Sequence, residues 1–198
     1  MQPSIRRRQL LALSAGASLP ALALAQTTNS LDAASWAALK SPGSIVLFRH
    51  ALAPGGGDPP GFKADDCSTQ RNLSEEGRVQ AQRIGKELQG RGIKVQAVWH
   101  SAWCRTRDTA QIAFPDLREP TLRAEPAFNS FFGDRSTEPA QTAAARKMLL
   151  AWRGPGTLVV VTHQVNITQL TDIFPQSGEG VVLQRQGNKL ILKGRLPL

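Results

Sequence analysis

Cysteine and histidine are scarce in this chain of 198 residues. It contains two cysteines, Cys67 and Cys104, and three histidines, His50, His100 and His163. Neither residue type occurs at a metal-binding spacing such as His-Glu-x-x-His or paired Cys-x-x-Cys motifs. Internal repeats and low-complexity tracts are also absent. We therefore expect a globular chain that needs neither a metal nor another cofactor.

Acidic residues are in the minority, with 15 Asp and Glu against 24 Lys and Arg, which gives a formal net charge of +9. Such a surplus suits anionic ligands, membrane surfaces or nucleic acid. The basic residues are scattered, without a lysine-rich stripe or a nucleic-acid recognition motif. We expect no nucleic-acid partner, and we interpret the charge as a solvated basic surface with one anion-binding pocket.

An apolar stretch near the start, from Leu10 to about Leu24, is too short for the ~20 residues that span a bilayer, so no stable membrane span is expected. It follows Arg6-Arg7-Arg8 and ends at Ala23-Leu24-Ala25, an A-x-A cleavage site. This order is typical of a secretory signal. The predicted boundaries are a signal peptide over 1–25 and a single domain over 26–198.

Because a secretory signal is expected, the expected location is periplasmic or secreted. The same expectation decides whether the two cysteines can form a disulfide. Arg7-Arg8-Gln9-Leu10-Leu11 resembles the twin-arginine motif, which would mean export after folding, and an ordinary signal with a basic start is the alternative. An oxidising compartment permits a disulfide between Cys67 and Cys104. Two separate buried thiols are the other interpretation, and the sequence leaves both open.

Two short apolar runs, Ser44–Arg49 and Thr157–Thr162, are each followed directly by a histidine, His50 and His163. Such β-branched runs are typical of central parallel strands that are covered on both faces. Ligands of open α/β sheets bind outside the carboxyl ends of the strands. The two histidines are therefore expected at the functional edge of a sheet.

Helical and strand patterns alternate along the rest of the chain, which predicts a three-layer α/β/α sandwich with a mostly parallel central sheet. Ser74 is expected to cap a helix with Glu75 and Glu76 in its first turn, where acidic residues suit the helix dipole. The other expected helices are 31–40, 103–113, 138–153 and 165–173, and the other expected strands are 95–99, 121–124, 181–184 and 190–193.

Four motifs recur in the order known from one family. They are Arg49-His50-Ala51, the run Arg71 to Ala81 that contains Leu-Ser-x-x-Gly-x-x-Gln-Ala, the run Ser101 to Ala110 that contains Ser-x-x-x-Arg-x-x-x-Thr-Ala, and Thr162-His163-Gln164. Together they resemble the histidine phosphatase superfamily, which shares the phosphoglycerate-mutase-like fold. The family's Arg-His-Gly signature has Ala51 in its third place here, which matters only where a positive φ is required.

The resemblance implies phosphoryl transfer through a phosphohistidine on His50. Arg49 and Arg105 would bind the phosphoryl oxygens, and His163 would donate a hydrogen bond to one of them. Arg105 is expected in the first turn of a helix, where phosphate is favoured. Ser101 and Gln164 match further motif positions and are expected to bind substrate.

The family's usual general acid is a glutamate shortly after the third strand, but the matching place reads Phe128-Asn129-Ser130. Asp134 is the first choice to replace it, followed by Asp66 and Glu125. The remaining alternative is no side-chain acid at all, which good leaving groups tolerate.

These residues together predict an exported phosphatase acting on a small phosphorylated substrate, such as phosphomonoesters or phosphorylated envelope sugars. The missing glutamate makes a mutase the weaker interpretation. A phosphate-binding protein without turnover and a surface interaction module are the rival hypotheses. For Arg71 two interpretations are open: its side chain reaches the pocket from the long loop, or it stays in solvent. Phe128, Phe131 and Phe132 are expected in the core. The sequence leaves the oligomeric state open.

Overall fold

The computed structural model describes residues 33–198, so the expected signal peptide over 1–25 lies outside the described residues. Within them, six strands form one sheet in the order β3-β2-β4-β1-β5-β6. The strands are β1 (Ser44–Arg49), β2 (Val95–His100), β3 (Leu122–Ala124), β4 (Thr157–Thr162), β5 (Gly180–Gln186) and β6 (Lys189–Leu196). The strands β1 to β4 run parallel, whereas β5 pairs antiparallel with β1 and β6 antiparallel with β5.

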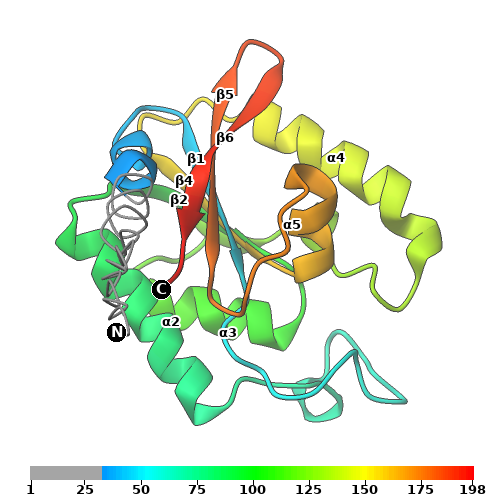
Figure 1. Cartoon of the computed structure of the whole chain (residues 1–198). Coiled ribbons are helices and arrows are strands. Elements are labelled where there is room, and N and C mark those ends of the chain that lie inside the picture. Colours follow the sequence, from blue (N-terminus) through cyan, green and yellow to red (C-terminus); the bar gives the residue numbers. More distant parts are fainter. Residues whose placement is uncertain (1–32) are drawn as a thin grey trace, which may run out of the picture.

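Helices cover both faces of this sheet (Figure 1). The helices α2 (Glu75–Gly90) and α3 (Cys104–Ala113) lie on one side, and α4 (Glu138–Ala151) and α5 (Gln164–Thr171) lie on the other. Residues 33–39 form a further short helix, where the sequence predicts one over 31–40. The predicted three-layer sandwich with a mostly parallel sheet is confirmed.

Alternation along the strands divides the core into two layers. On one face Val46, Phe48, Val159 and Val161 pack with Ile84 of α2 and other apolar side chains of α2 and α3. On the other face, side chains of β1, β4 and α4 pack together; these include Ile45, Leu47, Leu158, Val160 and Leu149. Because both faces of β1 and β4 are buried, the ends of these strands are held firmly in place.

Local signals explain where most elements begin and end. Ser74 caps α2 as expected, because its side-chain oxygen accepts a hydrogen bond from Gly77 N at 3.1 Å. The helix α5 ends at Thr171, two residues earlier than the pattern suggests, because Asp172 adopts a left-handed conformation with φ of 61°.

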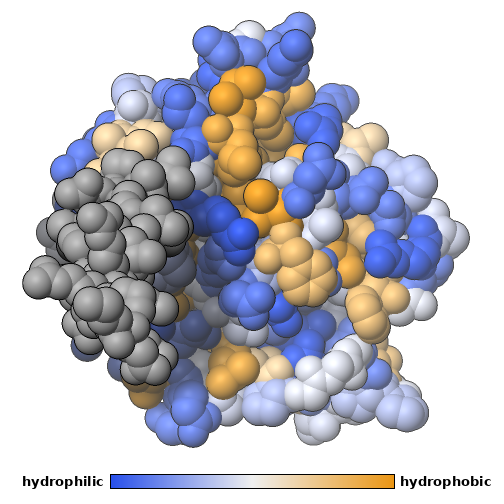
Figure 2. Space-filling model, in the orientation of Figure 1, coloured by the Kyte–Doolittle hydropathy of each residue, from blue (hydrophilic) through white to orange (hydrophobic). Residues whose placement is uncertain are grey.

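The two strands of the β5–β6 hairpin are longer than the predicted strands 181–184 and 190–193, and the hairpin lies at one edge of the sheet. Figure 2 shows apolar side chains gathered over this hairpin, where Leu192 is 44% exposed. Within residues 33–198 no helix is long and apolar enough to cross a membrane. The same residues contain no cluster of three or more side chains suited to hold a metal ion.

Candidate active site

The two histidines predicted at strand ends lie side by side at the carboxyl edge of the sheet. The pairing of β1 with β4 aligns Arg49 with Thr162, and His50 N donates to Thr162 O at 2.9 Å. The rings of His50 and His163 lie 5.7 Å apart between centroids in an edge-on arrangement. Ala51 is buried and does not have a positive φ, so alanine is accommodated where the family signature has glycine.

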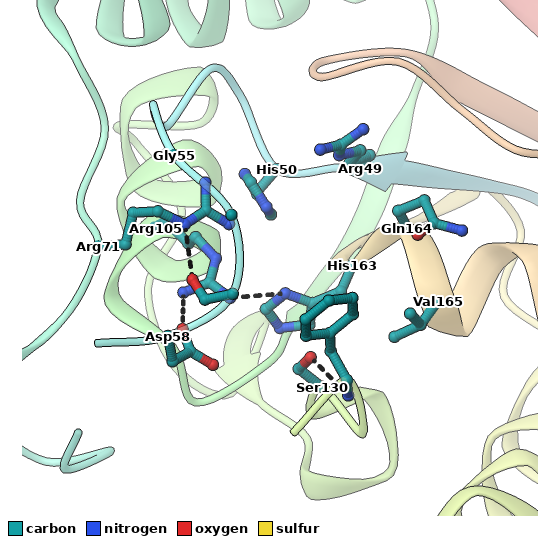
Figure 3. Close-up of a pocket in the computed structure, with 13 residues that line it drawn as sticks. Arg49, His50, Gly55, Asp58, Arg71, Arg105, Ser130, His163, Gln164 and Val165 are labelled. Carbon is teal, nitrogen blue, oxygen red and sulfur yellow. Dashed lines mark hydrogen bonds and ion pairs between the residues drawn. The ribbon is translucent and has the colours of Figure 1, made fainter. Parts of the chain in front are cut away.

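A pocket of about 150 Å³ opens between these histidines and the loop that follows β1 (Figure 3). This volume is below the roughly 300–1,000 Å³ of pockets that bury a drug-sized ligand, so it suits a small group. The lining residues are Arg49, His50, Gly55, Gly56, Gly57, Asp58, Arg71, Arg105, Ser130, Phe132, His163, Gln164 and Val165.

Three arginines give the pocket a strongly cationic character. Burial and the neighbouring Arg105 lower the pKa values of Arg49 and Arg71, and burial lowers that of Arg105, although Asp58 opposes this. Within the described part of the chain, the buried Nε atoms of Arg49 and Arg105 have no hydrogen-bond partner. Unpaired buried donors are costly. A phosphoryl group, with its acceptor oxygens, would satisfy such donors and balance the charge.

His50 is neutral, and a hydrogen bond to the backbone fixes which of its ring nitrogens carries the hydrogen. Its Nδ1 lies 2.8 Å from Ala51 O, and a carbonyl oxygen only accepts, so Nδ1 carries the hydrogen and Nε2 keeps a lone pair. Burial, followed by the charge of Arg105, lowers the pKa of His50 from 6.5 to about 3, and the Ala51 hydrogen bond only partly opposes this. The ring is 2% exposed and lines the pocket.

His163 faces Arg105 on one side and Ser101 on the other. Its Nδ1 lies 3.5 Å from Arg105 Nη2, and its Nε2 lies 2.8 Å from Ser101 Oγ. Burial and then Arg105 lower the pKa of His163 well below its ordinary value. Ser101 is fully buried behind His163 and does not line the pocket. This corrects the expected substrate contact of Ser101, which instead holds the His163 ring.

The neutral state of His50 predicts a specific acid sensitivity. Below pH 6.5 the unfolded chain binds a proton on this ring that the folded protein binds only near pH 3. The contribution of the neutral His50 ring to the free energy of unfolding is therefore fully present above pH 6.5 and is lost as the pH falls towards about 3. We expect urea unfolding to show that His50→Asn loses less stability than the parent protein between pH 7 and pH 4. Equal losses in the two proteins would contradict this assignment.

The carboxyl group that reaches the pocket is Asp58, not one of the three predicted acids. Its Oδ1 lies 2.7 Å from Arg105 Nη1. Asp134, the first choice, is exposed, and its carboxylate accepts hydrogen bonds from Ser136 at the start of a short 3-10 helix. The structure does not bring Asp134 to the pocket, and its carboxylate is bound in this local cap instead. Our prediction of Asp134 as the acid is therefore corrected.

The two other candidate acids have equally local roles. Asp66 caps the 3-10 helix Cys67–Thr69 by accepting from Ser68 N at 3.0 Å, and Glu125 pairs with Arg123 at 2.7 Å. Neither side chain lines the pocket. Asn129, in the segment Phe128-Asn129-Ser130 that stands where the family has its glutamate, accepts a hydrogen bond from Ala102 N through Oδ1 at 2.8 Å and so holds the segment that follows β2.

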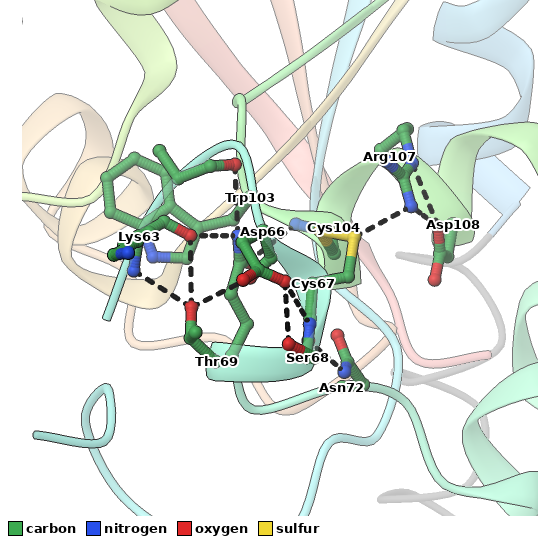
Figure 4. The surroundings of a disulfide bond; sticks show 12 residues. Lys63, Asp66, Cys67, Ser68, Thr69, Asn72, Trp103, Cys104, Arg107 and Asp108 are labelled. Atoms are coloured by element: carbon green, nitrogen blue, oxygen red, sulfur yellow. Dashed lines mark hydrogen bonds and ion pairs between the residues drawn. A yellow bond between two sulfur atoms is a disulfide. The ribbon is translucent and has the colours of Figure 1, made fainter. Parts of the chain in front are cut away.

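The loop between β1 and α2 is attached to the start of α3 by a disulfide between Cys67 and Cys104 (Figure 4). The two Cα atoms are 5.7 Å apart. Phe62 stacks on Trp103 with 5.0 Å between ring centroids, and Gln70 Oε1 accepts from Cys104 N at 2.9 Å. Of the two interpretations left open by the sequence, the structure has the paired one. The loop that carries Asp58 is thereby fixed beside the pocket.

Removal of this disulfide is expected to destabilise the fold. The bond closes a loop with a sequence separation of 37. Loop-closure entropy predicts a loss of about 3–4 kcal/mol in the free energy of unfolding for Cys67→Ala/Cys104→Ala. Urea unfolding of the parent and the double variant measures this loss. Two free thiols in the unfolded, unreduced parent would show that the bond is absent.

The remaining predicted residues divide between pocket and core. Gln164 lines the pocket as expected, and Arg71 also reaches it, where its Nε donates to Gly57 O at 3.0 Å. Phe128 and Phe131 are buried in the core. Phe132, expected beside them, is instead 56% exposed and lines the pocket.

The sequence of the chain matches the model of one known protein family. The model of the histidine phosphatase superfamily (branch 1) matches residues 45–153, more than half of the chain. The chain belongs to the histidine phosphatase superfamily. The match ends before His163, so the position of that residue in the site rests on the fold. No curated protein sequence matches the chain.

Solved structures of this class share the fold at low sequence identity. Phosphoserine phosphatase from Entamoeba histolytica, in complex with 3-phosphoglyceric acid, has a TM-score of 0.57 and 14% identity over 78% of this chain and 97% of its own. Phosphoglycerate mutase from Thermus thermophilus has a TM-score of 0.54 and 16% identity over 78% of this chain and 99% of its own. The protein histidine phosphatase SixA, complexed with tungstate, has a TM-score of 0.54 and 15% identity over 77% of this chain and 96% of its own. The phosphoglycerate-mutase-like fold is thereby confirmed.

Proposed function

We propose that this protein is an exported phosphatase that hydrolyses phosphomonoesters through a phosphohistidine on His50. One observation carries the proposal: a buried, neutral His50 lies in the same small pocket as His163, Arg49, Arg71 and Arg105. A lone pair on Nε2 is available for bond formation. The guanidinium groups supply the positive charge that phosphoryl transfer requires.

The charges of the pocket match those of the substrate class. Three arginines and one carboxylate leave two positive charges around neutral histidines. A phosphomonoester carries about −1.5 to −2 charges at pH 7. Guanidinium groups bind such oxygens through short, charge-assisted hydrogen bonds. Arg49 and Arg105, joined by Arg71, thus bind and orient the phosphoryl group in front of His50.

In the first step His50 Nε2 attacks phosphorus, and the bond from phosphorus to the leaving oxygen breaks. His50 Nδ1–H continues to donate its hydrogen bond to Ala51 O, and this bond keeps the ring in position. Arg105 Nη2 lies 3.5 Å from His163 Nδ1, and because a guanidinium only donates, Nδ1 accepts and His163 Nε2–H donates to Ser101 Oγ at 2.8 Å. His163 thus orients the Arg105 guanidinium, whose remaining donors bind the phosphoryl oxygens.

In the second step water attacks the phosphohistidine and inorganic phosphate is released, while the proton that the water gives up replaces the one taken by the leaving oxygen in the first step. The bond between phosphorus and His50 Nε2 breaks, and the electron pair returns to the ring nitrogen. The small pocket accommodates the phosphoryl group, while the rest of the substrate extends past the exposed ring of Phe132. Phosphomonoesters of small molecules or of envelope sugars suit this shape. Export by the expected signal over residues 1–25 would bring the enzyme to such substrates.

The test is hydrolysis of p-nitrophenyl phosphate by the purified protein in the presence of EDTA, with rapid alkaline quenching of a ³²P-labelled substrate. We expect release of phosphate and transient label on the peptide that contains His50. Label on another residue, or turnover without label, would contradict the phosphohistidine mechanism.

A phosphate-binding protein without turnover is the second candidate, since Asp58 already pairs with Arg105 and the usual glutamate is replaced. That protein would be stabilised by inorganic phosphate against thermal unfolding but would neither hydrolyse the ester nor become labelled. This outcome would replace the phosphatase proposal.

A further inference from the structure

Among the described residues that line the pocket, Asp58 alone is acidic. The four motifs of the family do not include it, since it lies in the long loop between β1 and α2. The carboxylate is bound on both oxygens. Oδ1 lies 2.7 Å from Arg105 Nη1, and Oδ2 accepts from Trp103 Nε1 at 2.9 Å. Its side chain is 18% exposed, so solvent reaches one part of it.

The loop holds Asp58 rigidly. Gly55 and Gly57 have φ of 94° and 68°, values that favour glycine, and they turn the chain around the pocket. Arg71 donates to the backbone oxygens of Ala53 and Gly57 on either side of this turn. Trp103, which binds the carboxylate, is next to the disulfide-bonded Cys104. A side chain that is fixed so firmly beside the reacting group is suited to proton transfer.

The direction of attack gives the side of the pocket where a proton is needed. In-line displacement places the nucleophile and the leaving oxygen on opposite sides of phosphorus. His50 and Asp58 lie on opposite sides of the Arg105 guanidinium in Figure 3. A phosphoryl group bound by Arg105 and facing His50 therefore directs its leaving oxygen towards Asp58.

We propose that Asp58 is the general acid and base of this site, a role that rests on the phosphatase function proposed above. In the first step the Asp58 carboxyl group gives its proton to the leaving oxygen as the bond to phosphorus breaks. In the second step the resulting carboxylate accepts a proton from the attacking water. One alcohol and one inorganic phosphate are released, and His50 and Asp58 return to their initial states.

Substrate binding provides the protonated carboxyl group. In the free protein the Asp58 side chain forms an ion pair with Arg105. The incoming dianion adds two negative charges beside Asp58 and competes for the same guanidinium. A proton taken up from solvent on binding relieves this repulsion. Asp58 therefore has its proton when the leaving oxygen requires it.

The experiment compares three esters with different demands for a proton. The phenolate that leaves from p-nitrophenyl phosphate is stable without a proton, whereas the oxygens that leave from phenyl phosphate and glycerol phosphate need one. For Asp58→Asn we expect kcat/KM, which reports the first step, within about threefold of the parent for p-nitrophenyl phosphate, and a loss of roughly 10²–10³-fold in kcat/KM for glycerol phosphate. The matched control is Asp65→Asn, an exposed acid in the same loop, which should follow the parent on all three esters.

Binding of inorganic phosphate, measured by calorimetry, separates proton transfer from positioning of Arg105. Asp58→Asn should bind phosphate at least as tightly as the parent, because the carboxylate no longer competes for Arg105. An equal loss on all three esters together with weaker phosphate binding would overturn the proposal and leave Asp58 as a positioning residue. A parent protein without activity on p-nitrophenyl phosphate would overturn the phosphatase function itself.

Discussion

His50→Asn is expected to lower kcat/KM for p-nitrophenyl phosphate by about 10⁴-fold or more, since removal of a covalent nucleophile has effects of this order. Asparagine has no ring nitrogen with a lone pair, so the bond to phosphorus cannot form. Its amide can still donate to Ala51 O, as His50 Nδ1 does. Steady-state hydrolysis without added metal measures the effect.

His100→Asn is the matched control for this variant. His100 is the last residue of β2, is buried, and places Nδ1 2.7 Å from the carbonyl oxygen of the next residue, Ser101. It does not line the pocket. We expect its activity to stay within about threefold of the parent. Comparable losses in the two variants would mean that His50 has only a structural role, and retained activity in His50→Asn would exclude the phosphohistidine.

The sequence predicts the central part of this fold well because the strands are encoded locally. β1 and β4 are continuous apolar runs between Gly-Pro segments and a histidine, and no helix pattern competes with them. Their adjacency brings His50 and His163 together, which follows from parallel pairing alone. The motif that contains Arg105 begins directly after another strand, β2, so its place at the same edge is also predictable.

Side chains on the long loops could not be placed from the sequence. Asp58 and Arg71 reach the pocket because the loop between β1 and α2 folds around glycines with positive φ and is held by contacts with distant residues. Phe132 reaches the pocket from another loop, between β3 and α4. Such contacts have no periodic signal. The prediction of Asp134 is wrong for the opposite reason: its Asx cap with Ser136 is local, and it keeps the carboxylate away from the pocket. The sequence Asp-x-Ser at 134–136 could have indicated this cap.

Arg105→Ala is expected to lower kcat/KM by roughly 10²–10³-fold, because this guanidinium contacts the place where negative charge develops. The side chain is 3% exposed, and it joins Asp58 to His163. Its loss removes donors to the phosphoryl oxygens and leaves Asp58 without its ion pair. Phosphate binding by calorimetry should weaken in parallel, since Arg105 binds both ground state and transition state.

Arg105→Lys distinguishes charge from geometry. An ammonium group keeps the positive charge but cannot bind Asp58 and a phosphoryl oxygen through the fixed fork of a guanidinium. We expect lysine to recover part of the phosphate affinity and less of kcat, because the transition state requires the planar arrangement. Arg107→Ala is the control, since Arg107 lies on the same helix, pairs with Asp108 and does not line the pocket. Full activity in Arg105→Lys would show that positive charge alone suffices, and normal phosphate binding in Arg105→Ala would place the anion site elsewhere.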